Sequence, residues 1–236
     1  MSWDWNFAIE VFPEILGAIW LVIAITFGSF IVALILGLVL TFARRSSFKP
    51  LSLLVYAFIE FVRSTPPLVQ LFFVYFALPA IGISINKYTA GIVTLGIHYS
   101  TYVSEVYRSG IEAIPKGQWE AAKAMNFSKT QTWFRIILPQ AIPPVIPMLG
   151  NYLIVLFKET PILMAIGVGE FLQKAQLIGS THFKYLEPIT IVGLLFLLLS
   201  YPSALLINRL EQKSNQAFTG KKNRRLTNQF HLKSGA

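Results

Sequence analysis

The feature that most constrains this chain is a run of 29 residues without charge, from Ile15 to Ala43. A helix of that length crosses the hydrocarbon core of a bilayer with some tilt, so the run predicts a first membrane span at residues 15–43. No Lys or Arg precedes it and it is far longer than the apolar core of a signal peptide, so we expect it to stay in the membrane. Arg44 and Arg45 follow at once, which places this end in the cytoplasm and the N-terminus outside.

Hydrophobic runs recur along the whole chain. Of its 236 residues, 54% are hydrophobic, which is typical of a membrane protein with several spans rather than a soluble domain. Most Lys and Arg residues collect at the ends of these runs on one side, so the net charge of +9 indicates topology rather than nucleic-acid binding. We predict an all-α polytopic protein of the cell membrane, N-terminus out and C-terminus in, with five transmembrane helices at residues 15–43, 52–85, 88–107, 148–171 and 188–208.

The stretches outside these spans complete the organisation. Residues 1–14, which include Trp3 and Trp5 among acidic residues, are expected to form an extracytoplasmic lead-in at the membrane interface. The transmembrane domain covers residues 15–211 and includes an outer loop at residues 172–187. Residues 212–236 are predicted to be a basic, flexible cytoplasmic tail.

Two predicted spans are interrupted by charges and proline. In the second, Ser64–Pro67 breaks the helix, but neither half is long enough to cross alone, so we expect one long kinked span. Glu60 and Arg63 precede the break and either pair beside a cavity or anchor the span at the cytoplasmic interface. The fourth span contains residues 158–161, Lys-Glu-Thr-Pro, whose charges should face protein or water because they are costly in lipid.

The only long polar interval between spans, residues 111–145, is predicted to be a structured cytoplasmic segment. Residues 116–125 are helix-compatible and follow Pro115, which suits a first helical turn. Asn126 stands where that helix should end, and asparagine best tolerates, after glycine, the left-handed backbone of a C-terminal cap. Ser128 and Gln131 have the spacing of a capping box that starts a second helix. From this pattern alone, the two helices could equally rest on the bilayer surface.

Sequence motifs for catalysis, cofactors and metals are absent. No Gly-rich loop precedes a Lys-Ser or Lys-Thr pair, so the chain is not expected to hydrolyse ATP. It has no HExxH, no GxSxG and no cysteine, and its three histidines lie far apart, so we expect no catalytic residue, no cofactor and no metal site. An intramembrane enzyme would have to use Glu60, Glu105 or Glu170, and an assembly scaffold is a third class of function.

The polar segment also resembles a known motif. Its Glu-Ala-Ala, turn residue and Ile-x-Leu-Pro match the EAA motif of bacterial ABC importer permeases, with asparagine where that family usually has glycine. The resemblance covers about residues 13 to 211. Residues 63–71, residues 102–111 with 115–120, and residues 158–161 with 167–168 are similar to signatures of the polar amino-acid permease subfamily. Within the subfamily, residues 99–102 and 140–147 and Asn126 look most like permeases of ectoine and hydroxyectoine importers.

This resemblance implies an ABC transporter type-1 permease fold and a subunit that forms the membrane passage for a small polar or zwitterionic solute. The implied solute is ectoine or hydroxyectoine, and the alternative is a polar amino acid such as glutamine, arginine or cystine. The implied partners are ABC ATPase subunits, a second permease chain, an extracytoplasmic solute-binding protein and membrane lipid. The motif residues that would couple to the ATPase are Glu120, Ala121, Ala122, Asn126, Ile136, Leu138 and Pro139.

Five further residues are candidates to line the substrate passage: Tyr99, Tyr102, Glu105, Lys158 and Glu159. Tyr99 and Tyr102 share one face of the third span, and Glu105 lies on that face one turn on. Aromatic faces beside charges suit a zwitterion or a delocalised cation. The same charges could instead form ion pairs that hold the spans together, Glu105 with Arg108 and Lys158 with Glu159.

Overall fold

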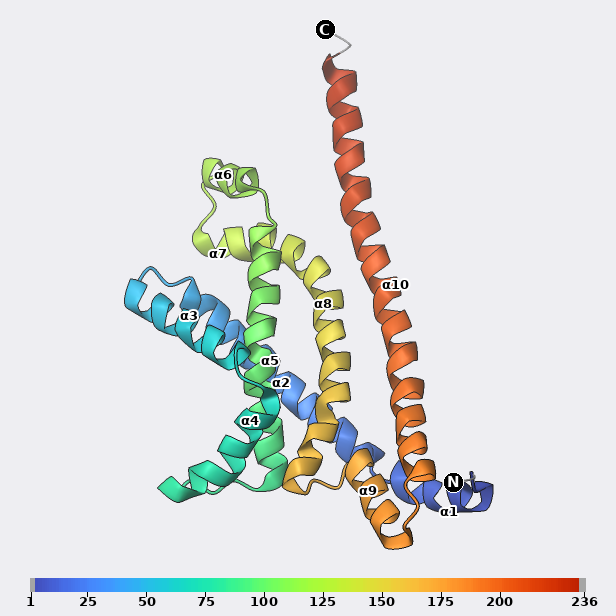
Figure 1. Ribbon diagram of the computed structural model, residues 1–236. Coiled ribbons are helices and arrows are strands. Elements are labelled where there is room, and N and C mark those ends of the chain that lie inside the picture. Colours follow the sequence, from blue (N-terminus) through green and yellow to red (C-terminus); the bar gives the residue numbers. More distant parts are fainter. Residues whose placement is uncertain (1–2, 234–236) are drawn as a thin grey trace. The chain divides into compact units, whose positions relative to one another are not determined.

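The computed structural model describes the backbone of residues 3–233 and the side chains up to residue 212. Every regular element in that part of the chain is helical (Figure 1), which confirms the all-α prediction. Two compact units are formed, one by residues 1–108 and 152–202, the other by residues 109–151 and 203–236. The helices are α1 (Trp5–Leu16), α2 (Ile19–Arg44), α3 (Lys49–Arg63), α4 (Pro67–Phe72), α5 (Lys87–Glu112), α6 (Lys116–Ala124), α7 (Lys129–Thr132), α8 (Leu138–Glu159), α9 (Phe171–His182) and α10 (Leu186–Lys233). Between them lie π-helical turns at Phe73–Ala77 and Trp133–Ile137 and 3-10 turns at Leu78–Ile81 and Thr160–Ile166.

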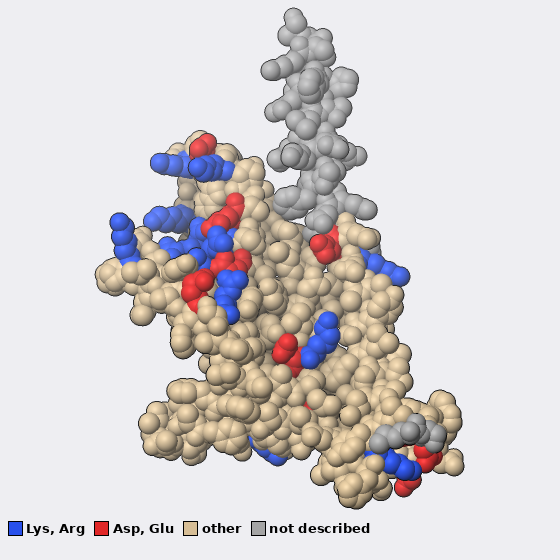
Figure 2. Space-filling view, viewed as in Figure 1, with Lys and Arg blue, Asp and Glu red and all other residues tan. Residues whose placement is uncertain are grey.

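Helix α1 covers most of the predicted lead-in and packs within the first unit. Asp4 caps it by accepting a hydrogen bond from the Phe7 amide at 3.1 Å. Two charged residues far along the chain contact the N-terminal end of α1. Lys184 pairs with Asp4 at 2.8 Å, and Glu187 accepts a hydrogen bond from the Asp4 amide at 2.9 Å. Figure 2 shows acidic and basic side chains side by side near the N-terminus. The apolar face of α1 meets α9 and α10 in one buried cluster that includes Phe7, Ala8, Val11, Ile15, Phe171, Ala175, Ile178, Ile191, Val192 and Leu195.

Helix α5 carries several fully buried hydroxyl side chains. Ser100, Thr101 and Ser104 each donate to the carbonyl three residues earlier, at 2.6 to 2.7 Å, whereas the buried hydroxyl of Thr94 on the same helix has no partner among the described residues. Small residues let α2 approach closely: a Cβ placed at Gly96 would lie 2.5 Å from Cγ1 of Val32. Helix α5 is therefore packed against protein rather than lipid, which explains why a helix this polar can lie within a membrane domain.

Three stretches are long and apolar enough to cross a membrane: Trp5–Arg44, Lys129–Ile166 and Leu186–Gln212. A fourth arises if α3 is joined to the stretch Pro67–Ile81, but these two arms bend by 102° at the break (Figure 1). The sequence thus predicts the position of the break but not its sharpness. Since α5 is too polar to qualify by composition, the count of five spans and their orientation stay predictions.

Three predicted boundaries differ from the structure. Residues 171–182, most of the predicted outer loop, form α9, because Glu170 caps its first turn by accepting from the amides of Leu172 at 2.8 Å and Gln173 at 2.7 Å. Helix α8 begins at Leu138, well before the predicted fourth span, and continues through Pro143, Pro144 and Pro147, which the prediction places outside that span. Helix α10 continues the fifth span to Lys233, and the side chains of the predicted basic tail from 213 on lie outside the described residues.

The predicted orientation can be measured because the chain has no cysteine of its own. We expect a cysteine at Ser180, exposed on α9, to react with a membrane-impermeant thiol reagent on intact cells. A cysteine at Lys129, exposed at the start of α7, should react only after the membrane is opened. The opposite labelling pattern would contradict the topology with the N-terminus outside.

Candidate substrate passage and coupling segment

Three side chains of α5 meet one side chain of α8 in the first unit. The ring centroids of Tyr99, Tyr102 and Tyr152 lie 5.9 to 6.2 Å apart, and the His98 ring lies 5.2 Å from Tyr99 and 5.5 Å from Tyr102. These separations are those of favourable aromatic pairs. His98 and Tyr99 are buried, whereas Tyr102 and Tyr152 are half-buried. The four residues, named here the aromatic cluster, therefore combine a packed side with an accessible one.

The aromatic cluster also carries three phenol hydroxyls. Among the described residues, the hydroxyls of Tyr99, Tyr102 and Tyr152 have no hydrogen-bond partner. A phenol can both donate and accept, so the three hydroxyls offer polar contacts beside apolar ring faces.

One cation and one anion adjoin the aromatic cluster. The guanidinium carbon of Arg63 lies 4.8 Å from the centroid of Tyr102, within the range of a cation–π contact. Glu159, half-buried at the end of α8, interacts electrostatically with Tyr99. No ion pair joins Arg63 to Glu60 within the described part of the chain, so the pairing considered for these two residues is not present.

Gln70 joins the broken helix to the aromatic cluster. Its amide nitrogen donates to the Val62 carbonyl at 2.7 Å and to the Thr65 hydroxyl and carbonyl at 2.6 and 3.2 Å, on the other side of the break. Its amide oxygen lies 3.2 Å from Nδ1 of His98 on α5. Pro66 and Pro67 have no backbone N–H to donate. The Gln70 amide therefore supplies hydrogen-bond donors to the backbone carbonyls at the break, as a broken helix inside a membrane domain requires.

The predicted passage residues separate into two places. Tyr99, Tyr102 and Glu159 belong to or adjoin the aromatic cluster. Glu105 instead contacts Arg44 of α2 and pairs with Arg108 at 2.6 Å, so the ion pair considered for it is present. Lys158 is exposed and makes no ion pair with Glu159 among the described side chains.

Sequence reasoning missed Tyr152, His98 and Gln70 as members of this site. Tyr152 shares no helical spacing with the α5 tyrosines, because it reaches them from a helix some fifty positions further along the chain. Gln70 lies within residues 63–71, which resemble a permease signature, but the resemblance assigns it no role. The available signal was polarity: Gln70 is a polar residue three positions after Pro67, and His98 directly precedes Tyr99.

Within the coupling segment, helix α6 ends in a complete Schellman motif. Asn126 has φ +56°, which confirms the left-handed conformation predicted for it. Its amide donates to the Lys123 carbonyl at 3.0 Å, and the Phe127 amide donates to the Ala122 carbonyl at 3.0 Å, so two terminal carbonyls of α6 are satisfied. The predicted capping box follows, since Ser128 and Gln131 exchange hydrogen bonds at 2.9 and 3.2 Å.

The two short helices of the segment are held together by aromatic packing. Trp119 and Trp133 stack edge to face with centroids 5.5 Å apart, above a small core that contains Ile114, Ile137 and Ala141. Of the motif residues, Ala122 is fully buried and Ile136 and Leu138 are half-buried, whereas Glu120, Ala121, Asn126 and Pro139 are exposed. Met125 and Phe134 are also exposed, at 66% and 68%, and give the segment an uncovered apolar surface in the second unit.

The family model for the inner-membrane component of binding-protein-dependent transport systems matches residues 33–216. The chain belongs to this family. It is therefore a multi-pass component of a transport system in the inner membrane, not an enzyme, as the absence of catalytic motifs led us to expect. The match covers both the aromatic cluster and the coupling segment.

Relatives of this permease family support the assignment over almost the whole chain. A probable amino-acid ABC transporter permease protein of Sinorhizobium fredii is 41% identical over 87% of this chain and 91% of the relative. The arginine transport system permease protein ArtQ of Bacillus subtilis is 37% identical over 84% and 91%. A solved structure described as an amino acid ABC transporter with histidines has a TM-score of 0.85 at 32% identity, over 90% of this chain and all of the other. A methionine ABC transporter with a TM-score of 0.69 at 24% identity has the same fold.

Proposed function

We propose that the chain is the permease subunit of an ATP-driven importer for a polar amino acid, and that the aromatic cluster lines the passage. The observation that carries the proposal is the meeting of three half-buried or buried tyrosines with one cation and one anion. A polar amino acid is a zwitterion with both charges on one carbon. Arg63 can bind its carboxylate and Glu159 its ammonium group, while the tyrosine rings and hydroxyls bind the rest.

Ectoine and hydroxyectoine are the second candidate class. They are favoured by the resemblance of residues 99–102, 126 and 140–147 and by the aromatic cluster, which also suits a delocalised cation. The relatives named above, however, are described as permeases for amino acids or for arginine. A polar amino acid fits those relatives better and requires no property that the aromatic cluster lacks.

The coupling segment, residues 111–145, is proposed to dock on an ABC ATPase subunit. Its rigid Schellman turn and capping box fix the angle between α6 and α7, and the exposed Met125 and Phe134 provide an apolar contact surface. A second permease chain completes the passage, and an extracytoplasmic binding protein delivers the solute. ATP binding to the partner would then move a segment of fixed shape, which is what coupling between separate sites needs.

The solute class is tested with the assembled transporter and its binding protein in proteoliposomes. We expect uptake of a labelled polar amino acid that needs ATP, and competition among arginine, glutamine and cystine stronger than by ectoine. Stronger competition by ectoine would select the second candidate. Absence of ATP-dependent uptake of either class would overturn the proposal.

The role of the aromatic cluster is tested by Tyr102→Ala. This change removes both a ring of the cluster and the surface under Arg63, so we expect maximal uptake to fall about fivefold to tenfold, as one or two lost aromatic contacts imply. Tyr102→Phe should lose less, because it keeps the ring. Tyr201→Ala, which removes an exposed tyrosine of α10, is the matched control and should leave uptake unchanged. Equal uptake by Tyr102→Ala and the control would place Tyr102 outside the passage.

A further inference from the structure

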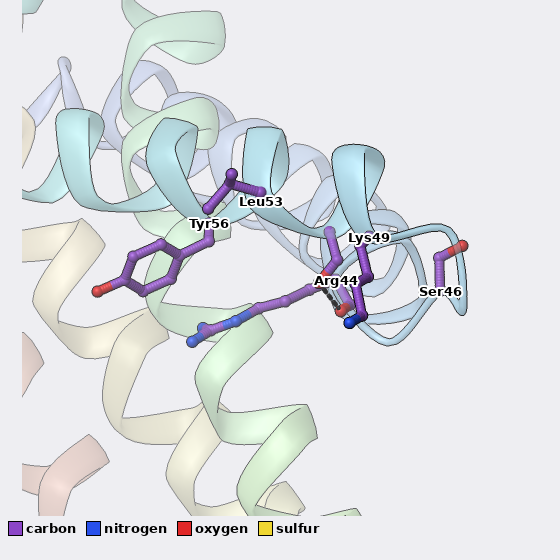
Figure 3. A pocket seen from close by; sticks show the side chains of 6 residues that line it. Arg44, Ser46, Lys49, Leu53 and Tyr56 are labelled. Atoms are coloured by element: carbon purple, nitrogen blue, oxygen red, sulfur yellow. Dashed lines mark hydrogen bonds between the residues drawn. The ribbon is translucent and has the colours of Figure 1, made fainter.

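A shallow, open pocket with two basic side chains lies at the turn between α2 and α3. It is lined by Arg44, Ser46, Lys49, Ser52, Leu53 and Tyr56. Figure 3 shows the long side chain of Arg44 extended beneath Tyr56, with Lys49 and Ser46 at the turn. The Ser52 hydroxyl donates to the Arg44 carbonyl at 2.6 Å and so joins the end of α2 to the first turn of α3.

The charges of the pocket favour an anion. Two cationic side chains line it and no carboxylate does. Outside the lining, Glu105 contacts Arg44 and also pairs with Arg108, and the guanidinium carbon of Arg44 lies 5.1 Å from the centroid of the Tyr56 ring. Lys49 is exposed and has no ion-pair partner among the side chains that the structure describes. The first turn of α3 adds the positive end of a 15-residue helix.

The surface around the pocket is strongly apolar. Phe48, Leu53 and Leu54 are 65%, 68% and 69% exposed, and Phe42 on α2 is 49% exposed. A soluble anion would gain nothing from these side chains. An anionic phospholipid would, because its phosphate and its acyl chains are joined and would meet cations and apolar side chains respectively.

We propose that this pocket binds the phosphate headgroup of an anionic phospholipid. Arg44 and Lys49 contact the phosphate, the hydroxyl of Ser46 donates a hydrogen bond to it, and the acyl chains lie along Leu53 and Leu54. The predicted orientation places the α2–α3 turn at the cytoplasmic leaflet. Anionic lipids there attract the basic residues at helix ends. A bound headgroup would hold the end of α2 to the beginning of α3, next to the arm that leads to the break at Ser64–Pro66.

The purified, assembled transporter is exchanged into detergent that contains phosphatidylglycerol or phosphatidylcholine. Native mass spectrometry then counts the lipids that it retains. We expect phosphatidylglycerol to be retained preferentially, and Lys49→Gln to lower its occupancy about fivefold, the effect of one basic residue near a membrane surface. Lys49→Arg should keep the preference. Arg209→Gln removes an exposed charge from the same predicted side, outside the pocket, and is the matched control.

Three outcomes would overturn the proposal: equal retention of the two lipids, equal losses in Lys49→Gln and Arg209→Gln, or displacement of phosphatidylglycerol by excess inorganic phosphate alone. The last result would assign the pocket to a soluble anion. None of these measurements depends on the identity of the transported solute. Arg44 is not substituted, because its loss would also remove one of the two cationic partners of Glu105.

Discussion

Replacing Asn126 with valine is expected to reduce ATP-driven uptake at least tenfold while replacing it with glycine preserves uptake. The Asn126 side chain is exposed, so substitution changes no buried packing and acts only on the backbone. At φ +56° an ordinary residue is less stable by about 1–2 kcal/mol, and a β-branched residue by more. Valine therefore favours loss of the Schellman hydrogen bonds that fix α6 relative to α7, whereas glycine removes the cost.

The measurement is uptake together with stimulation of the partner ATPase by solute-loaded binding protein. Asn126→Ala should fall between glycine and valine, because it has a Cβ without branching. Thr130→Val is the matched control, since it places valine on an exposed site of α7 with ordinary helical backbone. If the glycine and valine variants couple equally well, the fixed turn is not needed for coupling.

The coupling segment was predictable because its structure is set by neighbouring residues. The stop at Asn126 and the restart at Ser128 each depend on hydrogen bonds across at most five residues. The same holds for the break at Ser64–Pro66, where two prolines cannot donate. What the sequence shows least well is a boundary that depends on tertiary support, and α8 is the example, because it continues through prolines that in isolation would end a helix.

The passage could be predicted only in part. The pairing of Tyr99 with Tyr102 follows from helical spacing, but the approach of Tyr152 depends on how α8 packs against α5. Glu105 shares the spacing of the tyrosines, yet Arg44, sixty-one positions earlier, draws it into an ion pair instead. Spacing along one helix determines which residues share a face, whereas the partner on that face comes from a distant segment that no local pattern identifies.

Gln70 makes such a long-range contact, with His98 on α5, and its replacement is the second substitution expected to have a large effect on uptake. We expect Gln70→Leu to lower uptake roughly tenfold or more. Leucine has a similar volume but provides no donor for the carbonyls of Val62 and Thr65 and no acceptor for His98. Each hydrogen bond lost at a partly buried site costs about 1 kcal/mol, and an orphaned buried group costs more. Two such losses lower the population of the state in which the helix break is joined to His98 by about tenfold or more.

The alternative to a lost link is lost folding, and three measurements separate them. Gln176→Leu makes the same chemical change at an exposed position of α9 and should leave uptake and assembly unchanged. Gln70→Leu should still assemble with its partners, because Thr65 retains its own hydrogen bonds to the carbonyls of Phe61 and Val62. In the His98→Phe background, Gln70→Leu should cost less than in the native chain, since the bond between the two side chains is already gone. Additive losses would mean that Gln70 acts on the helix break alone and not through the aromatic cluster.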